Sequence, residues 1–453
     1  MKVINHGNAT LIVAIAIMMS GCIESAFPIQ TGEGSIRGLN SAVTTATLAF
    51  VLEEQLIGAT AYKDTTVVRV FHNLTYNASF DYQFFGDLRP TRLATVPFDL
   101  VKDHDYLFIF TGSLAAPAAM VWERPIRAWD GTETVFEVEF GHLSPQLAEV
   151  DIYFAAPGTV PVLGQARATL SNGNHSPVME MPAGDYEVIV TSKDDPTDII
   201  FQSSSITYGA ASNVLVSIFD WDPSITAPIS VRLIFGTGTN VELADINSPP
   251  TLRTLQATIG NGPVDLYRNL DFTAPLIANV AFSEVSAPVD TVSGISTYTF
   301  TDAGNSGAVL SEEDFTVVAG QRSTRILVGQ PGTPLTMPTV DDFRSLEDSS
   351  KLRISQTSVN QTIVDIYLIV QGDDINDAVP RFFSLPLLSS TNYINVVDNT
   401  YDLYATIPFE KTIVGGPYTF SVVAGDVVHF ALIDTVDPNV VEFLEYDHVG
   451  VTP

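Results

Sequence analysis

The chain has 453 residues, and its 21 Lys and Arg against 52 Asp and Glu give a formal net charge of −31. A field of this sign repels the phosphate backbone of nucleic acids, which argues against any function in nucleic acid binding. Hydrophobic residues make up 45% of the chain and charged residues 16%, so the chain as a whole is not disordered and can bury a sizeable core. The length predicts about three or four domains of roughly 100–200 residues each.

The N-terminal residues have the layout of a secretory signal. Lys2 supplies positive charge, and the run Ala9–Met19 is apolar except for Thr10. This run is too short to span a bilayer, because spanning takes about 20 consecutive apolar residues. The run ends in Met19-Ser20-Gly21-Cys22, and residues 1–21 are therefore predicted to be a signal peptide.

Cys22 is the only cysteine in the sequence, so no disulfide can form within the chain. The tetrad that it ends resembles the lipobox of bacterial lipoproteins, with Met19 where that family prefers Leu. The resemblance implies that Cys22 is acylated, becomes the new N-terminus and anchors the protein to a membrane. Ile23 in place of Asp implies, by proteobacterial sorting rules, the outer membrane, with the protein facing the periplasm or the cell surface.

Residues 22–65 are predicted to be the lipidated cysteine followed by a flexible tether or leading segment. Residues 23–42 mix Ser, Gly, Pro and Thr with no sustained period, which is typical of a linker. The segment Leu48–Ile57 is compatible with a short helix and equally with a leading strand.

From Thr66 onward, short runs rich in Val, Ile, Phe, Tyr and Thr recur between Gly, Pro, Asn and Asp. Examples are Val67–Phe71, Tyr186–Val190, Val214–Phe219 and Val231–Phe235. Strands bounded by turns have this texture, and helices of three turns or more do not. The sequence therefore predicts an all-β fold.

A similar tetrad recurs along this part of the chain, at Val150–Tyr153, Val264–Tyr267 and Val364–Tyr367, with a looser copy at Phe80–Gln83. Neighbouring copies lie about one Ig-like domain apart, which favours tandem Ig-like or transthyretin-like β-sandwiches over a solenoid of short repeats. The predicted domains are repeat 1 at residues 66–134, repeat 2 at 135–247, repeat 3 at 251–335 and repeat 4 at 351–447.

Companion motifs follow the tetrads in a fixed order. The second copy continues with Pro182–Val188 and the strand Val214–Phe219, while the third and fourth copies carry the turns Val317–Gly320 and Val422–Gly425, which are interpreted as hairpin corners. This order resembles the DUF4397 family, a domain of unknown function found in exported bacterial proteins. The resemblance extends over about residues 66–447. It implies a fold and a location but no reaction, because the family has no settled activity.

Each full tetrad contains an aspartate: Asp151, Asp265 and Asp365. Side chains alternate between the two faces of a strand, so these carboxylates are predicted to point away from the core, where an outward charge protects a sheet edge. The alternative is that each carboxylate serves as a ligand or an acid.

The sequence contains no nucleophile elbow, P-loop, His-Glu-x-x-His motif or cluster of Cys and His, and we expect no catalytic residue and no enzymatic activity. His72 and His142 follow the predicted first strands of the first two copies. A turn-capping role is favoured for both, because no partner for a catalytic base is visible. Surface or packing roles are expected for His104, His175, His429 and His448.

One acidic loop is the preferred candidate for a metal site. Asp373, Asp374 and Asp377 could supply oxygen ligands to calcium, which takes six to eight oxygens from flexible loops. Asp and Asn are also the residues that β-turns use, so a turn without metal is the competing interpretation. No other cofactor is predicted.

Together these features predict a non-enzymatic envelope lipoprotein that acts as a binding, adhesive or spacer protein, held to the membrane by its lipid and facing an unknown protein or glycan partner. One alternative is an envelope glycan-active enzyme whose carboxylates meet only in the fold. Another is a carbohydrate-binding module, because sugar rings could stack on tryptophans near the predicted loops. The tryptophans are Trp122, Trp129 and Trp221.

Overall fold

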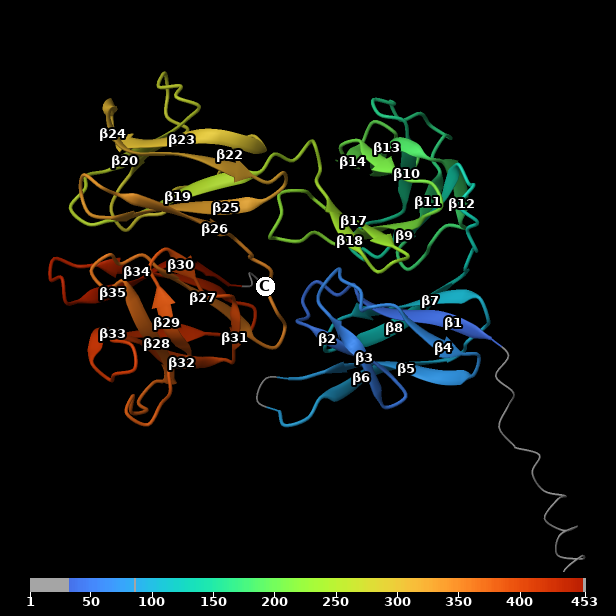
Figure 1. Cartoon of the computed structure of the whole chain (residues 1–453), viewed down its shortest axis with the longest axis horizontal. Coiled ribbons are helices and arrows are strands. Elements are labelled where there is room, and N and C mark those ends of the chain that lie inside the picture. The colour runs from blue at the N-terminus through green and yellow to red at the C-terminus, as the bar shows by residue number, and fades with distance from the viewer. Residues whose placement is uncertain (1–31, 85–86, 451–453) are drawn as a thin grey trace, which may run out of the picture.

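The computed structural model describes residues 32–84 and 87–450, and every regular element in these ranges is a β-strand. The strands form four β-sandwiches arranged roughly in a square (Figure 1), which confirms the all-β prediction. We number them domain 1 (32–127), domain 2 (133–247), domain 3 (250–341) and domain 4 (349–450). Cys22 and the predicted signal peptide lie outside the described residues. Within the described ranges, no helix has the length and hydropathy needed to cross a membrane.

The strands of domain 1 are β1 (Glu33–Asn40), β2 (Leu48–Leu52), β3 (Gln55–Thr60), β4 (Arg69–His72), β5 (Thr75–Tyr82), β6 (Thr91–Asp99), β7 (His104–Gly112) and β8 (Pro117–Pro125). Those of domain 2 are β9 (Val135–His142), β10 (Val150–Ala155), β11 (Ala168–Leu170), β12 (Met179–Pro182), β13 (Gly184–Ser192), β14 (Ile199–Gln202), β15 (Ile206–Tyr208), β16 (Asn213–Phe219), β17 (Ser230–Phe235) and β18 (Asn240–Leu243).

Domain 3 consists of β19 (Thr251–Thr258), β20 (Val264–Arg268), β21 (Ile277–Val280), β22 (Val289–Asp290), β23 (Gly294–Asp302), β24 (Asn305–Val317), β25 (Arg322–Gly329) and β26 (Leu335–Val340). Domain 4 consists of β27 (Ser350–Gln356), β28 (Ile363–Val370), β29 (Phe382–Pro386), β30 (Ser389–Ser390), β31 (Ile394–Val396), β32 (Asn399–Thr406), β33 (Ile413–Val422), β34 (Val427–Asp434) and β35 (Val441–Val449).

The four domains share one strand topology. In each, the first strand pairs in parallel with a late strand, giving β1 with β7, β9 with β16, β19 with β25 and β27 with β34. The second strand of each domain lies in the other layer and pairs antiparallel with β5, β13, β23 or β32. In domain 4 a single pairing of Gly415 with Val441 joins the two layers into one nine-stranded sheet.

The prediction of a tether over residues 22–65 is wrong from Glu33 onward, because β1, β2 and β3 all belong to domain 1. β1 is almost completely buried although it contains Ser35, Arg37 and Asn40. Polar residues of this kind are typical of a linker when only the sequence is considered. The buried groups that pair with them come close only when the domain folds. The segment Leu48–Ile57, which the sequence allows as a helix or a strand, forms strands of the hairpin β2–β3.

The looser tetrad Phe80–Gln83 is not the counterpart of the other three, because it lies in and just after β5. The tetrad strands β10, β20 and β28 correspond to β2, since each is the second strand of its domain and each has antiparallel neighbours on both sides. Ala49 of β2 therefore takes the place of the tetrad aspartate in domain 1. The turns ending in Gly320 and Gly425 are also not hairpin corners, because β24 does not pair with β25, nor β33 with β34.

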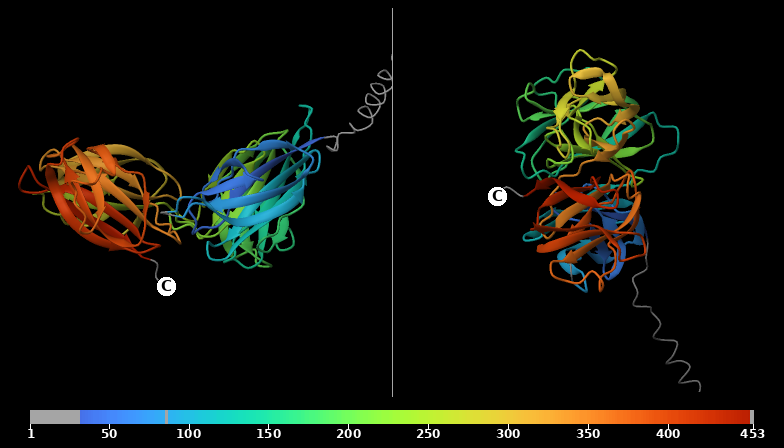
Figure 2. Two further views of the ribbon diagram at one scale, coloured as in Figure 1. Left: turned by 90° about the horizontal axis from the view of Figure 1, so that it is seen from below. Right: turned by 90° about the vertical axis from the view of Figure 1, so that its left-hand side faces the viewer.

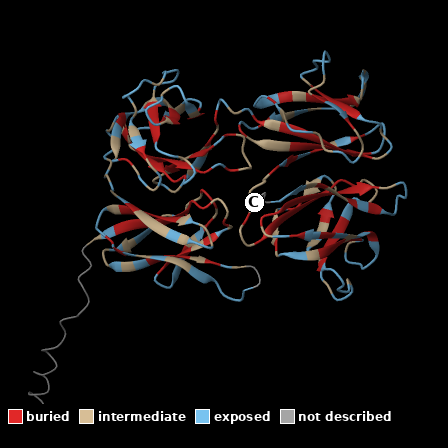
Figure 3. Cartoon of the chain, turned by 180° about the vertical axis from the view of Figure 1, so that it is seen from behind, coloured by how far each residue is buried: buried red, intermediate tan, exposed pale blue. Residues whose placement is uncertain are grey.

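The domains are fused in pairs, domain 1 with domain 2 and domain 3 with domain 4. Figure 2 shows the two pairs as separate lobes. Apolar residues from the facing sheets form a core between domains 1 and 2, in which Leu107 and Trp122 meet Leu215 and Phe219. A side chain on Gly141 would lie 2.5 Å from the Trp122 ring, so glycine is required for this approach. A second core between domains 3 and 4 has the same character. Figure 3 shows burial running along the strands while the loops stay exposed.

The linker 342–348 between domains 3 and 4 ties the two lobes together. Arg344 donates to two backbone carbonyls of domain 1, at 2.9 and 2.7 Å. Glu347 accepts a backbone N–H of the same domain at 2.7 Å. Asp342 accepts the Ser224 hydroxyl of domain 2 at 2.6 Å. A segment far along the chain thus fastens all the domains into one body.

Buried ion pairs occupy the centre of this body. Lys351 of domain 4 pairs with Asp342 at 2.8 Å, and Lys63 of domain 1 pairs with Asp222 of domain 2 at 2.9 Å. Burial lowers the pKa of Lys351 to about 8, even though Asp342 favours its charged form. The Lys63–Asp222 pair joins domain 1 to domain 2 and so couples their positions, whereas the Lys351–Asp342 pair holds the linker on domain 4.

Candidate functional site

Charged residues of the first strands lie on the sheet faces where the domains meet. Arg37, Glu139, Arg253 and Arg353 hold the same position in domains 1 to 4, because their parallel partners are Leu107, Leu215, Thr324 and His429. All four residues are at most 9% exposed. Buried charges are costly unless they are paired, so these positions are the natural place to look for a site.

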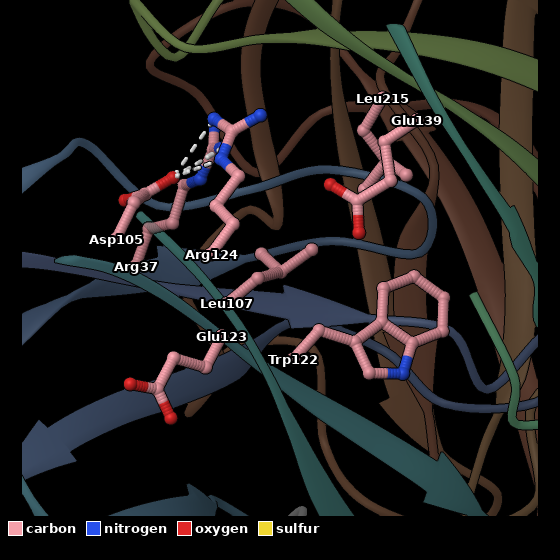
Figure 4. Close-up of a pocket in the computed structure, with 8 residues that line it drawn as sticks. All are labelled: Arg37, Asp105, Leu107, Trp122, Glu123, Arg124, Glu139 and Leu215. Carbon is pink, nitrogen blue, oxygen red and sulfur yellow. Dashed lines mark hydrogen bonds and ion pairs between the residues drawn. The ribbon is translucent and has the colours of Figure 1, made fainter. Parts of the chain in front are cut away.

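Between domains 1 and 2, the Asp105 carboxylate binds three donors, of which Figure 4 shows the two arginines. The Ser35 hydroxyl lies 2.6 Å from one oxygen, and Arg37 and Arg124 reach the other at 3.1 and 2.9 Å. Arg37 also donates to the backbone carbonyl of Phe235 in domain 2, at 2.7 Å. The cluster therefore fixes domain 2 on domain 1.

On the domain 2 side of this interface, Glu139 pairs with His175, whose ring packs against Trp122 with centroids 5.0 Å apart. Figure 4 shows the Glu139 carboxylate pointing into the space between Trp122, Leu107 and the two arginines. The cavity that these residues line has a volume of about 10 Å³, which is room for one water molecule. It is too small to admit a substrate.

Between domains 3 and 4, Arg253 clamps two carboxylates. Its guanidinium lies 3.2 Å from Asp341 and also reaches both oxygens of Asp447. Arg353 donates to the other oxygen of Asp341 at 2.9 Å. Burial by itself would raise the pKa of Asp447, but the bonds from Arg253 and His429 lower it to about 2. A carboxylate held in this way cannot act as a general acid near neutral pH.

His429 lies at the base of this cluster and is fully buried. Its Nδ1 lies 2.8 Å from Asp447, and its Nε2 lies 2.8 Å from the Tyr393 hydroxyl. Burial lowers the pKa of His429, so the ring is neutral at pH 7. An ionised carboxylate only accepts, so Nδ1 carries the proton and Nε2 accepts the hydrogen bond from Tyr393. The relay Tyr393–His429–Asp447 was not foreseen from the sequence, which assigned His429 a surface or packing role.

A cavity of about 180 Å³ adjoins the cluster and is lined in part by Arg253, Arg322, Asp341 and Asp447. His429 is not among its lining residues. Both carboxylates that line the cavity are already bound by Arg253, and the His429 imidazole is fully buried. These ion pairs hold the facing sheets of domains 3 and 4 together.

His142 caps a turn, as the sequence predicts. Its Nδ1 accepts the Ser144 N–H at 3.2 Å and its Nε2 lies 3.0 Å from the Ala148 carbonyl. The same cap, from a side chain to the backbone N–H two residues later, is made at the equivalent position of the other domains. The residues are Asn40, Gln256 and Gln356. The corresponding prediction for His72 is wrong, because His72 is exposed on β4 and faces Glu33 at 3.6 Å.

The pH dependence of stability follows from His142. Burial lowers the pKa of His142 below 6.5. Below pH 6.5, His142 therefore binds a proton more readily in the unfolded chain than in the folded chain. Stability is therefore complete above pH 6.5 and falls as the pH decreases. We expect His142→Gln, which imitates domains 3 and 4, to keep the cap. It should reduce the slope of unfolding free energy between pH 6.5 and 5 by up to about 1.4 kcal/mol per pH unit.

Urea titrations at several pH values measure this slope. His72→Gln, which removes a half-exposed ring that caps no turn, is the matched control, and the effect of the cap is read as the difference in slope between the two variants. An unchanged slope in the His142 variant would contradict the assignment.

The tetrad aspartates are buried clamps, contrary to the prediction of outward charges at sheet edges. Asp365 accepts the N–H of Ser384 at 2.6 Å and that of Phe409 at 2.8 Å. Asp265 likewise binds two backbone N–H groups, and Asp151 binds one N–H and a threonine hydroxyl. Both oxygens of each carboxylate are occupied by these donors, which belong to neighbouring strands and loops. The strands lie between two neighbours, so no edge is exposed there to protect.

The predicted calcium loop forms a turn. Asp374 accepts the backbone N–H of Asn376 at 2.8 Å, and the Lys411 ammonium donates to the carbonyl oxygens of Ile375 and Ala378. No group of three or more His, Cys, Asp or Glu placed to hold a metal occurs in the described ranges. Calcium binding by Asp373, Asp374 and Asp377 stays a prediction. A calcium-dependent rise in melting temperature that disappears on their replacement by Ala would support it.

The three tryptophans differ in environment. Trp122 is buried between domains 1 and 2 and donates to the Gly173 carbonyl at 3.3 Å. Trp221 is 45% exposed. Trp129 lies on the connection between β8 and β9 and lines a cavity of about 250 Å³.

One family comparison matches part of the chain. Residues 250–367 match the model of the family described as DUF4397, a domain of unknown function. The match covers domain 3 and extends through the linker to the tetrad of domain 4. It agrees with the resemblance seen in the sequence over this stretch.

Other comparisons add little. No curated protein matches the chain. Among solved structures, the Bacillus anthracis TIE protein aligns with a TM-score of 0.16 and 8% sequence identity, over 86% of this chain and 66% of that one. The chain thus spans slightly less than two thirds of that protein, and a TM-score this low carries no structural argument.

Proposed function

We propose that the protein is a non-enzymatic lipoprotein of the cell envelope, in which four β-sandwiches form a rigid platform that holds a binding surface away from the membrane. The observation that carries the proposal is the linker 342–348, which fastens domains 1 and 2 to the junction of domains 3 and 4. Separate sandwiches on flexible connections would need no such bonds. A body locked in this way is suited to spacing and presentation.

The export and anchoring part of the proposal rests on the sequence around Cys22. A single cysteine placed directly after an apolar run has the arrangement of an acylated N-terminus. One acyl chain gives only marginal membrane binding, whereas several chains anchor a protein stably. An anchored platform of this kind fits an acidic, soluble body projecting into an aqueous compartment.

Metabolic labelling with a clickable fatty acid tests the anchor. The wild-type chain is expected to carry the label and Cys22→Ser to lose it. Protease shaving of intact cells then places the protein, because digestion indicates the surface and protection indicates the periplasm. A wild-type chain that carries no lipid, or that stays in the cytoplasm, would refute the proposal.

A glycan-active enzyme is less well supported. Such an enzyme needs two carboxylates facing a substrate cleft, one of them with a raised pKa. The carboxylates that line the cavity between domains 3 and 4 are instead both clamped by Arg253, and the pKa of Asp447 is lowered. The cavity in Figure 4 has room for no more than one water molecule.

A further inference from the structure

Three loops converge at one end of domain 2 and enclose a cavity of about 250 Å³. One is the connection from β8 to β9, which carries Trp129. The second, residues 211–213, precedes and begins β16, and the third, residues 235–237, follows β17. The other residues that line the cavity are small or polar, apart from Phe235. An aromatic ring beside amide and hydroxyl groups is a combination that no structural role described above explains.

Trp129 presents one face to its surroundings, because the other is covered. The Arg127 guanidinium lies 4.3 Å from the centre of the indole ring. Arg127 is itself held by Glu180 at 2.6 Å and by Glu137 at 3.4 Å. The indole is therefore fixed in position before any ligand arrives, which lowers the entropy lost on binding.

The loop that carries Trp129 is also ordered internally. Glu133 accepts the backbone N–H groups of Asp130 and Gly131, at 2.7 and 2.8 Å. Asp130 in turn accepts the N–H of Thr132 at 2.8 Å. This network of short bonds gives the aromatic platform a defined orientation, although the loop is at the surface.

Asn213 supplies a directed polar group. Its Oδ1 lies 3.5 Å from Arg124, within the cluster of Figure 4, and its backbone carbonyl accepts the Gly236 N–H at 3.3 Å. Its Nδ2 has no protein partner among the residues that the structure describes. Ser212 and Thr237 add hydroxyl groups to the lining. The polar lining of the cavity is uncharged.

We propose that this cavity binds one neutral sugar ring, stacked on Trp129 and hydrogen-bonded by Asn213. The apolar face of a pyranose matches the indole, and its hydroxyls match the amide and hydroxyl lining. A volume below the roughly 300–1,000 Å³ of drug-sized pockets suits a single ring. The net charge of −31 disfavours an acidic sugar. The proposal gives a ligand class to the binding role proposed above and rests on that role.

Titration of the full-length chain in detergent with methyl glycosides of glucose, galactose, mannose and N-acetylglucosamine tests the site, read by saturation-transfer NMR and calorimetry. At least one glycoside should bind, and Trp129→Ala should weaken it about tenfold or more, equivalent to about 1.4 kcal/mol. Asn213→Ala should weaken it as well. Trp221→Ala, which removes an exposed indole outside this cavity, is the matched control and should bind as the wild type does. Unchanged melting temperatures would show that the variants are folded.

Three results would overturn the inference: no glycoside binding at millimolar concentration, equal binding by Trp129→Ala, or equal binding of methyl glucuronide. They are separate from a failure of the envelope proposal. An exported, lipidated chain that binds no glycoside would refute the sugar site alone, and a glycoside-binding chain that is never exported would refute the envelope role alone.

Discussion

Replacement of Arg253 by methionine is expected to destabilise the pair of domains 3 and 4 by about 3–5 kcal/mol. Arg253 neutralises both Asp341 and Asp447, and all three side chains are nearly buried. Without the guanidinium, two carboxylates would face each other at a sheet interface with too little compensating charge. Methionine keeps much of the volume, so the loss reflects charge more than a cavity.

Urea titration combined with hydrogen exchange of peptides from β19 and β34 measures this effect domain by domain. Arg92→Met is the control, because Arg92 forms an exposed pair with Asp81 at 3.0 Å and such pairs contribute about 0–1 kcal/mol. Equal stabilities of the two variants would show that the buried cluster does not hold domains 3 and 4 together.

Replacement of Asp365 by alanine has the second largest expected effect, a loss of about 2–4 kcal/mol confined to domain 4. The carboxylate is fully buried and accepts the N–H groups of Ser384 and Phe409, at 2.6 and 2.8 Å. Each orphaned buried donor costs about 1–3 kcal/mol. Both donors belong to residues with positive φ, 50° and 64°, a conformation that non-glycine residues adopt only with support.

Chemical denaturation and hydrogen exchange of the segments around Ser384 and Phe409 provide the measurement. Asp373→Ala, at an exposed carboxylate of the same domain, should change stability by less than about 0.5 kcal/mol. Asp365→Asn separates volume from acceptor capacity, because the amide nitrogen would face one of the two N–H groups. An Asn variant as stable as the wild type would argue against the clamp.

Much of the fold could be predicted from pattern. Strands with Val, Ile and Phe bounded by turn residues identified an all-β chain, and the tetrads located the second strands of domains 2, 3 and 4. β1 was missed because its buried positions hold Ser35, Arg37 and Asn40, and the hydrogen-bonding partners of Ser35 and Arg37 lie about 70 residues away or in another domain. Hydrophobic alternation cannot reveal a strand that is buried through polar pairing.

Among the candidate sites, too, some features could be predicted from the sequence and others could not. The cap at His142 depends on a local turn and could be predicted. The relay through His429 could not, because it needs Tyr393 from the connection between β30 and β31 and Asp447 from β35 to converge on β34. The only sequence signal was an Arg in the first strand of three domains, which becomes noticeable once the domains are aligned by register.

By itself, the sequence determined the all-β class, the expectation of a lipid at Cys22 and the argument against nucleic acid, because strand propensity, a signal motif and net charge are local or additive properties. Only the tertiary structure decided that the domains are fused in pairs, that the tetrad carboxylates are buried clamps and that Trp129 lines a cavity. Those outcomes depend on which distant groups satisfy a buried charge or an open hydrogen bond, and that is a property of contacts between residues that are far apart along the chain.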